Sequence, residues 1–118
     1  MADDNHDEVA TRWVQGLGGE WALLEELASP TMRVWHSHDD QWLSRAESEA
    51  RLAESGAAAA PPAFADLRVV VTTTGFVVQA SVDGPDGVGR MHIVQVCTVV
   101  DGRIATCEEY IAPEMALG

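Results

Sequence analysis

The stretch Arg90-Met-His-Ile-Val-Gln-Val-Cys-Thr-Val-Val100, the dipeptide Asp101-Gly102 and Arg103-Ile-Ala-Thr-Cys-Glu-Glu-Tyr-Ile-Ala112 together predict one long β-hairpin. Asp-Gly between two runs rich in β-branched residues is typical of a type I′ turn, whose two central residues both need a positive φ. Counting outward from this turn pairs Val94 with Glu109. Because side chains alternate across a strand, Glu109 would then share one face with His92, Val94, Val96, Cys107 and Ile111. A carboxylate and an imidazole on an apolar surface suggest a functional site, although a shift of one residue would dissolve the pairing.

The length and composition of the chain restrict its fold and its partners. A chain of 118 residues predicts a single domain spanning residues 1–118, with residues 1–7 flexible. The net charge is −12 and Lys and Arg total only seven, which argues against nucleic-acid binding. No apolar run approaches the roughly 20 residues of a membrane span, and the N-terminus is acidic and polar, unlike a signal peptide. The composition therefore predicts a cytoplasmic protein without membrane contact.

The two cysteines, Cys97 and Cys107, fall on strands that are expected to pair, offset by one residue in register. They have no CxxC spacing, and in a reducing compartment buried free thiols are expected rather than a disulfide.

Before the hairpin, the patterning predicts helices, a strand, another helix and two more strands. Residues 4–17 and 20–28 carry apolar residues at helical spacing, with Trp13 and Trp21 as core anchors. A short strand over 31–37 leads to a polar loop over 38–43. Ser44-Arg-Ala-Glu47 matches a capping box and opens a helix that reaches about Glu54, ended by Gly56. Strands over 67–74 and 76–82 follow, so the fold class is α+β, with a curved mixed or antiparallel sheet wrapped around N-terminal helices.

The element order and several motifs resemble the nuclear transport factor 2-like superfamily. The motifs are Val34-Trp35-His36-Ser37, Gly75-Phe76-Val77-Val78-Gln79, Val100-Asp101-Gly102-Arg103-Ile104 and Glu109-Tyr110-Ile111. Within the superfamily the chain is most similar to the SnoaL-like, ketosteroid isomerase-like and limonene epoxide hydrolase-like proteins. The resemblance implies a cone-shaped, cystatin-like fold with a central apolar cavity and a homodimer through the outer sheet face.

The resemblance carries over to only some site residues. Ketosteroid isomerase-like proteins keep an acidic base near the end of the first strand, where this chain has Ser37. In limonene epoxide hydrolase-like proteins the acid of the Asp-Tyr-Phe ending matches Glu109, whereas the accompanying Arg and Asp fall near Gln79 and Ser81. The resemblance also suggests that the Trp35/Ser37 face of the first strand lines the cavity, which would leave His36 outside or at the strand edge.

Three interpretations of Glu109 remain open: a catalytic acid or base, a buried acceptor of structural hydrogen bonds, and a surface residue. His36, His38 and His92 could in principle hold zinc, but no local motif supports this, so we expect neither a metal nor a cofactor.

These observations predict a small cavity enzyme that acts on a hydrophobic cyclic or polyketide-like molecule by isomerisation, cyclisation, dehydration or epoxide opening. Glu109 would transfer protons with help from His92 or His36. The predicted ligand-binding residues are Trp35, Ser37, His38, Trp42, Gln79, Ser81, Val94 and Ile111. The alternative is a non-catalytic small-molecule-binding or dimerisation module of the same fold.

Overall fold

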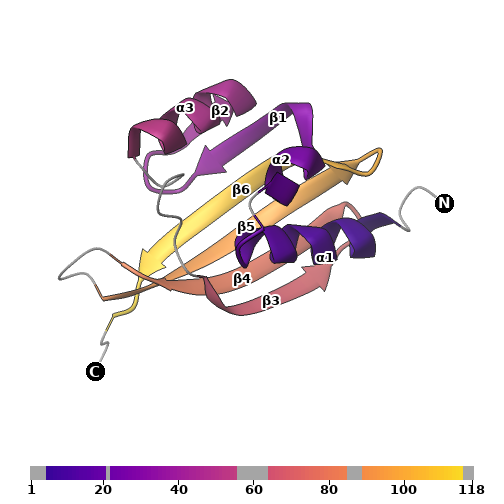
Figure 1. The fold of residues 1–118 in the computed structure, drawn as a ribbon. Helices are drawn as coiled ribbons and strands as arrows, with labels where there is room; N and C mark the ends of the chain where they lie inside the picture. The colour runs from indigo at the N-terminus through magenta and orange to yellow at the C-terminus, as the bar shows by residue number, and fades with distance from the viewer. Residues whose placement is uncertain (1–4, 21, 56–63, 85–88, 116–118) are drawn as a thin grey trace.

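The computed structural model describes residues 5–20, 22–55, 64–84 and 89–115, and it confirms the α+β class (Figure 1). The elements in chain order are α1 (Asn5–Leu17), α2 (Ala22–Leu27), β1 (Ala28–His36), β2 (Gln41–Ser44), α3 (Arg45–Ser55), β3 (Ala65–Val71), β4 (Gly75–Asp83), β5 (Arg90–Val100) and β6 (Arg103–Pro113). Within these ranges no helix is long and apolar enough to cross a membrane. The predicted helix end at Gly56 and the predicted core anchor Trp21 lie outside the described residues.

All six strands form one sheet in the order β2-β1-β6-β5-β4-β3. The last four strands of the chain are antiparallel neighbours, as predicted. β1 lies parallel to β6, which makes the sheet mixed. The prediction of a loop over 38–43 is wrong in part, because residues 41–44 form the short edge strand β2 against β1.

Helices α1 and α2 lie over one face of the sheet (Figure 1), and we call this face the inner face. Trp13 on α1 is 6% exposed, and its ring lies 6.5 Å from that of Phe76 on β4, which confirms its role as a core anchor. The inner face of the sheet contributes to the core Val34, Phe76, Val78, Cys97, Val99, Ile104 and Cys107. The opposite, outer face carries Trp35, Trp42, Gln79, Val94 and Tyr110.

The capping box predicted at the start of α3 is present. Ser44 N donates to Glu47 Oε1 at 2.9 Å, and Glu47 N donates to Ser44 Oγ at 3.2 Å. These bonds satisfy backbone amides that the first turn of a helix leaves free. The hydrogen bonds from Ser44 to the carboxylate lower the pKa of Glu47.

The β5–β6 hairpin has the predicted turn but a different register. Asp101 and Gly102 have φ values of 52° and 77°, as a type I′ turn requires, and Val99 pairs with Ile104 as expected. The next pair is Thr98 with Thr106, so Ala105 is an extra residue that forms a β-bulge in β6. A bulge reverses the alternation of the residues beyond it.

The bulge corrects three predictions about the hairpin. Glu109 pairs with Gln95 and not with Val94, so it lies on the inner face and away from His92. Cys97 lies directly opposite Cys107 rather than one residue out of register. Both cysteines are buried free thiols, as predicted. A hydrogen bond with Cys97, together with burial, raises the pKa of the Cys107 thiol, which keeps it protonated and unreactive.

Candidate functional site

A chain of polar side chains crosses the inner face of the sheet. Trp13 Nε1 donates a hydrogen bond to Gln95 Oε1 at 2.8 Å, and Gln95 Nε2 donates one to Glu109 Oε2 at 2.8 Å. The other carboxylate oxygen, Glu109 Oε1, lies 3.8 Å from His36 Nε2. We refer to these four residues, which come from α1, β5, β6 and β1, as the inner polar chain.

Strand pairing explains why these residues meet. Beyond the bulge, Gln95 and Glu109 are directly opposed on β5 and β6. The parallel pairing of β1 with β6 places His36 beside Glu109. Their inner-face neighbours are apolar, because the next pair along the hairpin is Ile93 with Ile111 and the preceding residue on the same face is Cys107. The backbone therefore brings a carboxylate and an imidazole together on an otherwise apolar surface.

The side chains of the inner polar chain are buried to different degrees. Gln95 is 5% exposed, whereas the side chains of Glu109 and His36 are 20% and 19% exposed. The end of the chain at Trp13 and Gln95 is therefore enclosed by the core. The end at Glu109 and His36 keeps partial access from outside.

His36 is unusual because its Nδ1 atom is buried and has no hydrogen-bond partner among the residues that the structure describes. A neutral imidazole has one donor and one acceptor nitrogen. A proton on Nε2 would point toward Glu109 and leave Nδ1 as a buried, unpaired acceptor. A proton on Nδ1 would leave a buried, unpaired donor and set a lone pair of Nε2 against the carboxylate. Neither neutral form therefore satisfies both ring nitrogens within the described residues.

The prediction for the first strand is wrong in its orientation. His36 was expected outside or at the strand edge, but its pairing with Glu109 places it on the inner face. Trp35 instead lies on the outer face, where its ring is 5.0 Å from that of Tyr110 and its Nε1 donates to Asp40 Oδ1 at 2.9 Å. The partner of β1 in the parallel pairing lies far away in the sequence, so alternation along β1 alone could not show which side faces inward.

The three residues that follow β1, which are Ser37, His38 and Asp39, lie at this end of the strand. Ser37 N donates to Glu109 O at 2.9 Å, and Ser37 Oγ accepts from Ile111 N at 3.0 Å. Ser37 therefore binds the backbone of β6 on both sides of Tyr110. The His38 side chain is 56% exposed and its ring lies 5.2 Å from that of His36. A hydrogen bond from Arg51 lowers the pKa of the neighbouring Asp39.

Four of the predicted ligand-binding residues lie on the outer face with Trp35. Trp42 is 41% exposed and stacks under the Arg33 guanidinium, which lies 5.0 Å from the ring centroid. Gln79, Ser81 and Val94 line a hollow of about 530 Å³ over β3, β4 and β5. This hollow and the inner polar chain are on opposite sides of the sheet.

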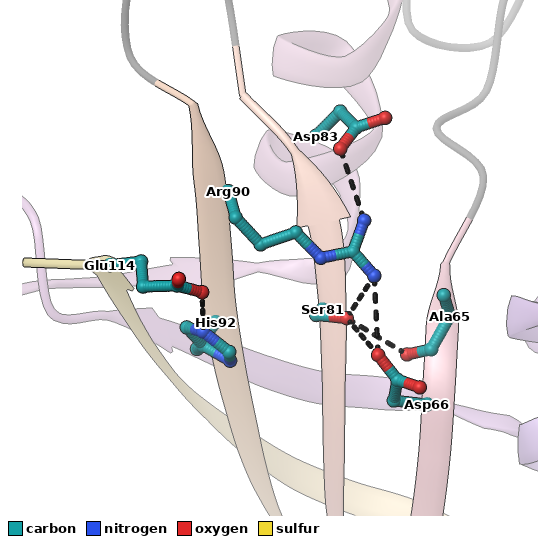
Figure 2. Close-up of polar contacts among 7 residues, drawn as sticks. All are labelled: Ala65, Asp66, Ser81, Asp83, Arg90, His92 and Glu114. Atoms are coloured by element: carbon teal, nitrogen blue, oxygen red, sulfur yellow. Dashed lines mark hydrogen bonds and ion pairs between the residues drawn. The ribbon is translucent and has the colours of Figure 1, made fainter.

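Figure 2 shows the polar contacts beside this hollow. Ser81 Oγ donates to Asp66 Oδ2 at 2.8 Å, and Arg90 bonds both of these residues and Asp83. The hydrogen bond from Ser81 is the largest cause that lowers the pKa of Asp66, and the bond from Arg90 is the next. The hydrogen bond to Asp83 raises the pKa of Arg90. This cluster ties together β3, β4 and β5 where β3 is irregular, because Asp66 has a φ of 54° and the register shifts between Ala65 and Arg68.

His92 also lies in this region, where its Nε2 is 2.9 Å from Glu114 Oε2 (Figure 2). The prediction that His92 shares a face with Glu109 is therefore wrong, because β5 presents its even-numbered residues to the outer side. His92 cannot assist Glu109 through the sheet. Among the described residues, no group of three His, Cys, Asp or Glu side chains could hold a metal ion.

Gln95 was not identified as a site residue from the sequence, and Trp13 was assigned to the core alone. The sequence contains a signal for Gln95 and another for the bulge that brings Gln95 opposite Glu109. Ile93, Gln95, Cys97 and Val99 alternate on β5, so Gln95 is a single polar residue at an inward position. Ile104 and Cys107 are three residues apart rather than two, which is the mark that a bulge leaves in an apolar pattern.

Comparisons with known proteins give information about the fold. No protein-family model matches the chain, and no curated protein matches it in sequence. Among solved structures, a candidate ketosteroid isomerase from Kribbella flavida superposes with a TM-score of 0.75 at 16% identity, covering 98% of this chain and 83% of that one. A candidate SnoaL-like polyketide cyclase from Jannaschia sp. CCS1 superposes with a TM-score of 0.69 at 20% identity, covering 93% of this chain and 87% of that one. An epoxide hydrolase from M. tuberculosis, similar to limonene epoxide hydrolase, superposes with a TM-score of 0.66 at 13% identity, covering 92% of this chain and 84% of that one.

Other matching structures are described as nuclear transport factor 2-like proteins and as having a cystatin-like fold. The chain therefore has the nuclear transport factor 2-like fold that the sequence predicted. At these identities the likeness establishes the fold alone, because one fold hosts many activities.

Proposed function

We propose that this protein is a small enzyme that uses Glu109 and His36 for acid–base chemistry on a hydrophobic cyclic or polyketide-like molecule. One observation carries the proposal: a carboxylate with one oxygen held by Gln95 directs its other oxygen toward an imidazole, and the second nitrogen of that imidazole is buried without a partner in the described part of the chain. This arrangement lies on an apolar face, where charged groups interact more strongly than in water. Acid–base groups of this kind serve isomerisation, cyclisation, dehydration and epoxide opening.

The residues have distinct roles in this mechanism. Glu109 takes a proton from the substrate at Oε1, the oxygen that Gln95 does not bind. His36 is close enough to exchange a proton with that oxygen after a small movement, because 3.8 Å exceeds an ordinary hydrogen-bond length by less than 1 Å. Ile111, which is half-buried, offers apolar contact to the body of the substrate next to the carboxylate. The names of the structural neighbours, an isomerase, a cyclase and an epoxide hydrolase, support this class of reaction.

Proton abstraction next to a carbonyl provides the most direct test of this function. Hydrophobic cyclic ketones are incubated with the protein in D₂O, and exchange of the α-protons is followed by NMR. Glu109→Gln should lower the exchange rate about 100-fold or more, in line with the usual contribution of a positioned base. Glu108→Gln is the matched control, since it makes the same chemical change one residue away on the outer side of β6. Equal rates for the native protein and Glu109→Gln would refute the proposal.

The non-catalytic module is the second candidate, and two observations favour it. Ser37 stands where isomerase-like proteins have an acid, and the bond from Gln95 is also what a structural carboxylate would make. Native mass spectrometry distinguishes the two functions. A hydrophobic molecule that co-purifies and stays unchanged, with no proton exchange in any ketone tested, would establish the binding module.

A further inference from the structure

We propose that Gln95 is a positioning residue that, together with Trp13, determines which oxygen of Glu109 reacts. This inference rests on the proposed function in one respect, namely that Glu109 is the proton-transferring group. It adds two residues from the core to the site, and it assigns the chemistry to one named atom, Glu109 Oε1.

The hydrogen bonds of the Gln95 amide have defined directions. The indole N–H of Trp13 can only donate, so the group that it meets at 2.8 Å must be the oxygen of the Gln95 amide. This leaves the NH₂ end of the amide to face Glu109 at 2.8 Å. A flipped amide would set two donors against each other at Trp13 and two acceptors against each other at Glu109. Trp13 therefore determines the orientation of Gln95.

The orientation of Gln95 in turn determines the protonation chemistry of Glu109. The oxygen bonded by Gln95 acts as an acceptor, and in a protonated carboxyl the carbonyl oxygen is a better acceptor than the hydroxyl oxygen. The hydrogen bond from Gln95 therefore favours a proton on the other oxygen, Oε1. This is the oxygen that lies 3.8 Å from His36 Nε2. If the carboxylate rotates and its two oxygens exchange places, the result is the same. One oxygen still accepts the hydrogen bond from Gln95, and the other still faces His36.

The surroundings hold this arrangement in place. Trp13 and Gln95 are 6% and 5% exposed, so water does not compete for their hydrogen bonds. Trp13 is packed on Phe76, which is fully buried, and it reaches the sheet from a separate element, α1. A long, flexible Gln side chain is thereby restricted at both ends of its amide. Orientation of a reacting group by such supporting residues commonly changes rates by one to two orders of magnitude.

NMR of the side-chain amide of Gln95 tests the inference without any substrate. The expected native spectrum has one Gln95 Nε2–H proton shifted downfield and protected from exchange with solvent. Glu109→Ala should abolish both the shift and the protection, and Trp13→Phe should broaden or move the same signal as the amide becomes free to flip. Gln15→Met, which lies on the exposed side of α1, should leave the signal in place. An unchanged Gln95 signal in Glu109→Ala would overturn the inference.

Kinetics supply the second readout and separate this inference from the proposed function. With a ketone that exchanges its α-protons, Gln95→Met should lower kcat about 10- to 100-fold with little change in KM, while Gln15→Met should match the native protein. Gln95→Met with native kcat would overturn the positioning role even if Glu109→Gln is inactive. Conversely, if Glu109→Gln keeps native exchange, the proposed function fails on its own test. Circular dichroism is used to check that each variant is folded. If Gln95→Met does not fold, Trp13→Phe is used for the same kinetic test.

Discussion

A double-mutant cycle on Trp13 and Gln95 measures how strongly the inner polar chain is coupled. Trp13→Phe keeps an aromatic ring beside Phe76 but leaves Gln95 Oε1 buried without a donor. A buried unsatisfied group costs about 1–3 kcal/mol, and the lost apolar area of the indole adds about 1 kcal/mol. We therefore expect Trp13→Phe to lower the free energy of unfolding by about 2–4 kcal/mol.

Gln95→Met preserves the length of the side chain and removes both of its hydrogen bonds. It leaves the Trp13 indole N–H buried without an acceptor and takes one donor from Glu109. The expected cost is about 1–3 kcal/mol. In the double variant the indole and the amide are both gone, so no unpaired group remains between positions 13 and 95. Its total cost should therefore fall short of the sum of the two single costs by about 1–2 kcal/mol.

Urea unfolding followed by far-ultraviolet circular dichroism is the appropriate assay, because removing a tryptophan would disturb a fluorescence signal. For a chain of 118 residues, each kcal/mol corresponds to a shift in Tm of about 3–6 °C. Trp13→Phe combined with Gln15→Met is the control cycle and should be additive. Costs for Trp13→Phe and Gln95→Met that add to within about 0.3 kcal/mol would refute the coupling.

Three further predictions concern the rest of the chain. Ser44→Ala should cost about 1 kcal/mol by removing the cap of α3, and unchanged urea unfolding would show that the capping box contributes nothing. The pKa of Asp66 is lowered from 3.8 in the folded protein, so the stability it provides is present above that value and is lost as the pH falls through its folded pKa. Asp66→Asn should therefore have a lower free energy of unfolding than the native protein at pH 7, and the gap between the two should narrow below about pH 4. A gap in the free energy of unfolding that does not change with pH would contradict this. The homodimer through the outer face remains a prediction, which sedimentation equilibrium tests directly, since a monomer at high concentration would exclude it.

The hairpin turn and its first pairs could be predicted from the sequence because they depend on local chemistry. Asp101 and Gly102 are suited to positive φ, and Val99 pairs with Ile104 by simple counting. The same local reasoning predicted the capping box of α3. It failed at Ala105, because a bulge depends on how two strands fit together over their whole length. Without that single residue, Glu109 was paired with Val94 instead of Gln95 and was associated with His92.

The remaining errors concern contacts between distant parts of the chain. The inward orientation of His36 follows from the parallel pairing of β1 with β6, which no local pattern along β1 encodes. Strand β2 has only four residues, too few to show a period, and it follows a turn in which Asp40 has a φ of 53°. Gln95 depends on Trp13, which is 82 residues away. The sequence thus pointed to Glu109 and to His36 as one of its two possible partners, and the structure was needed to show that these two lie beside each other and beside Gln95.

We expect a hydrophobic molecule to bind this protein on the inner face, next to Glu109 and His36. This binding is tested by titrating a cyclic ketone such as cyclohexenone into the ¹⁵N-labelled protein and following the NMR spectrum. The largest shifts should occur at the Gln95 side-chain amide and the Trp13 indole N–H, and Glu109→Ala should bind the ketone less tightly. Shifts confined to the indole N–H groups of Trp35 and Trp42 and the Gln79 amide on the outer face would contradict it.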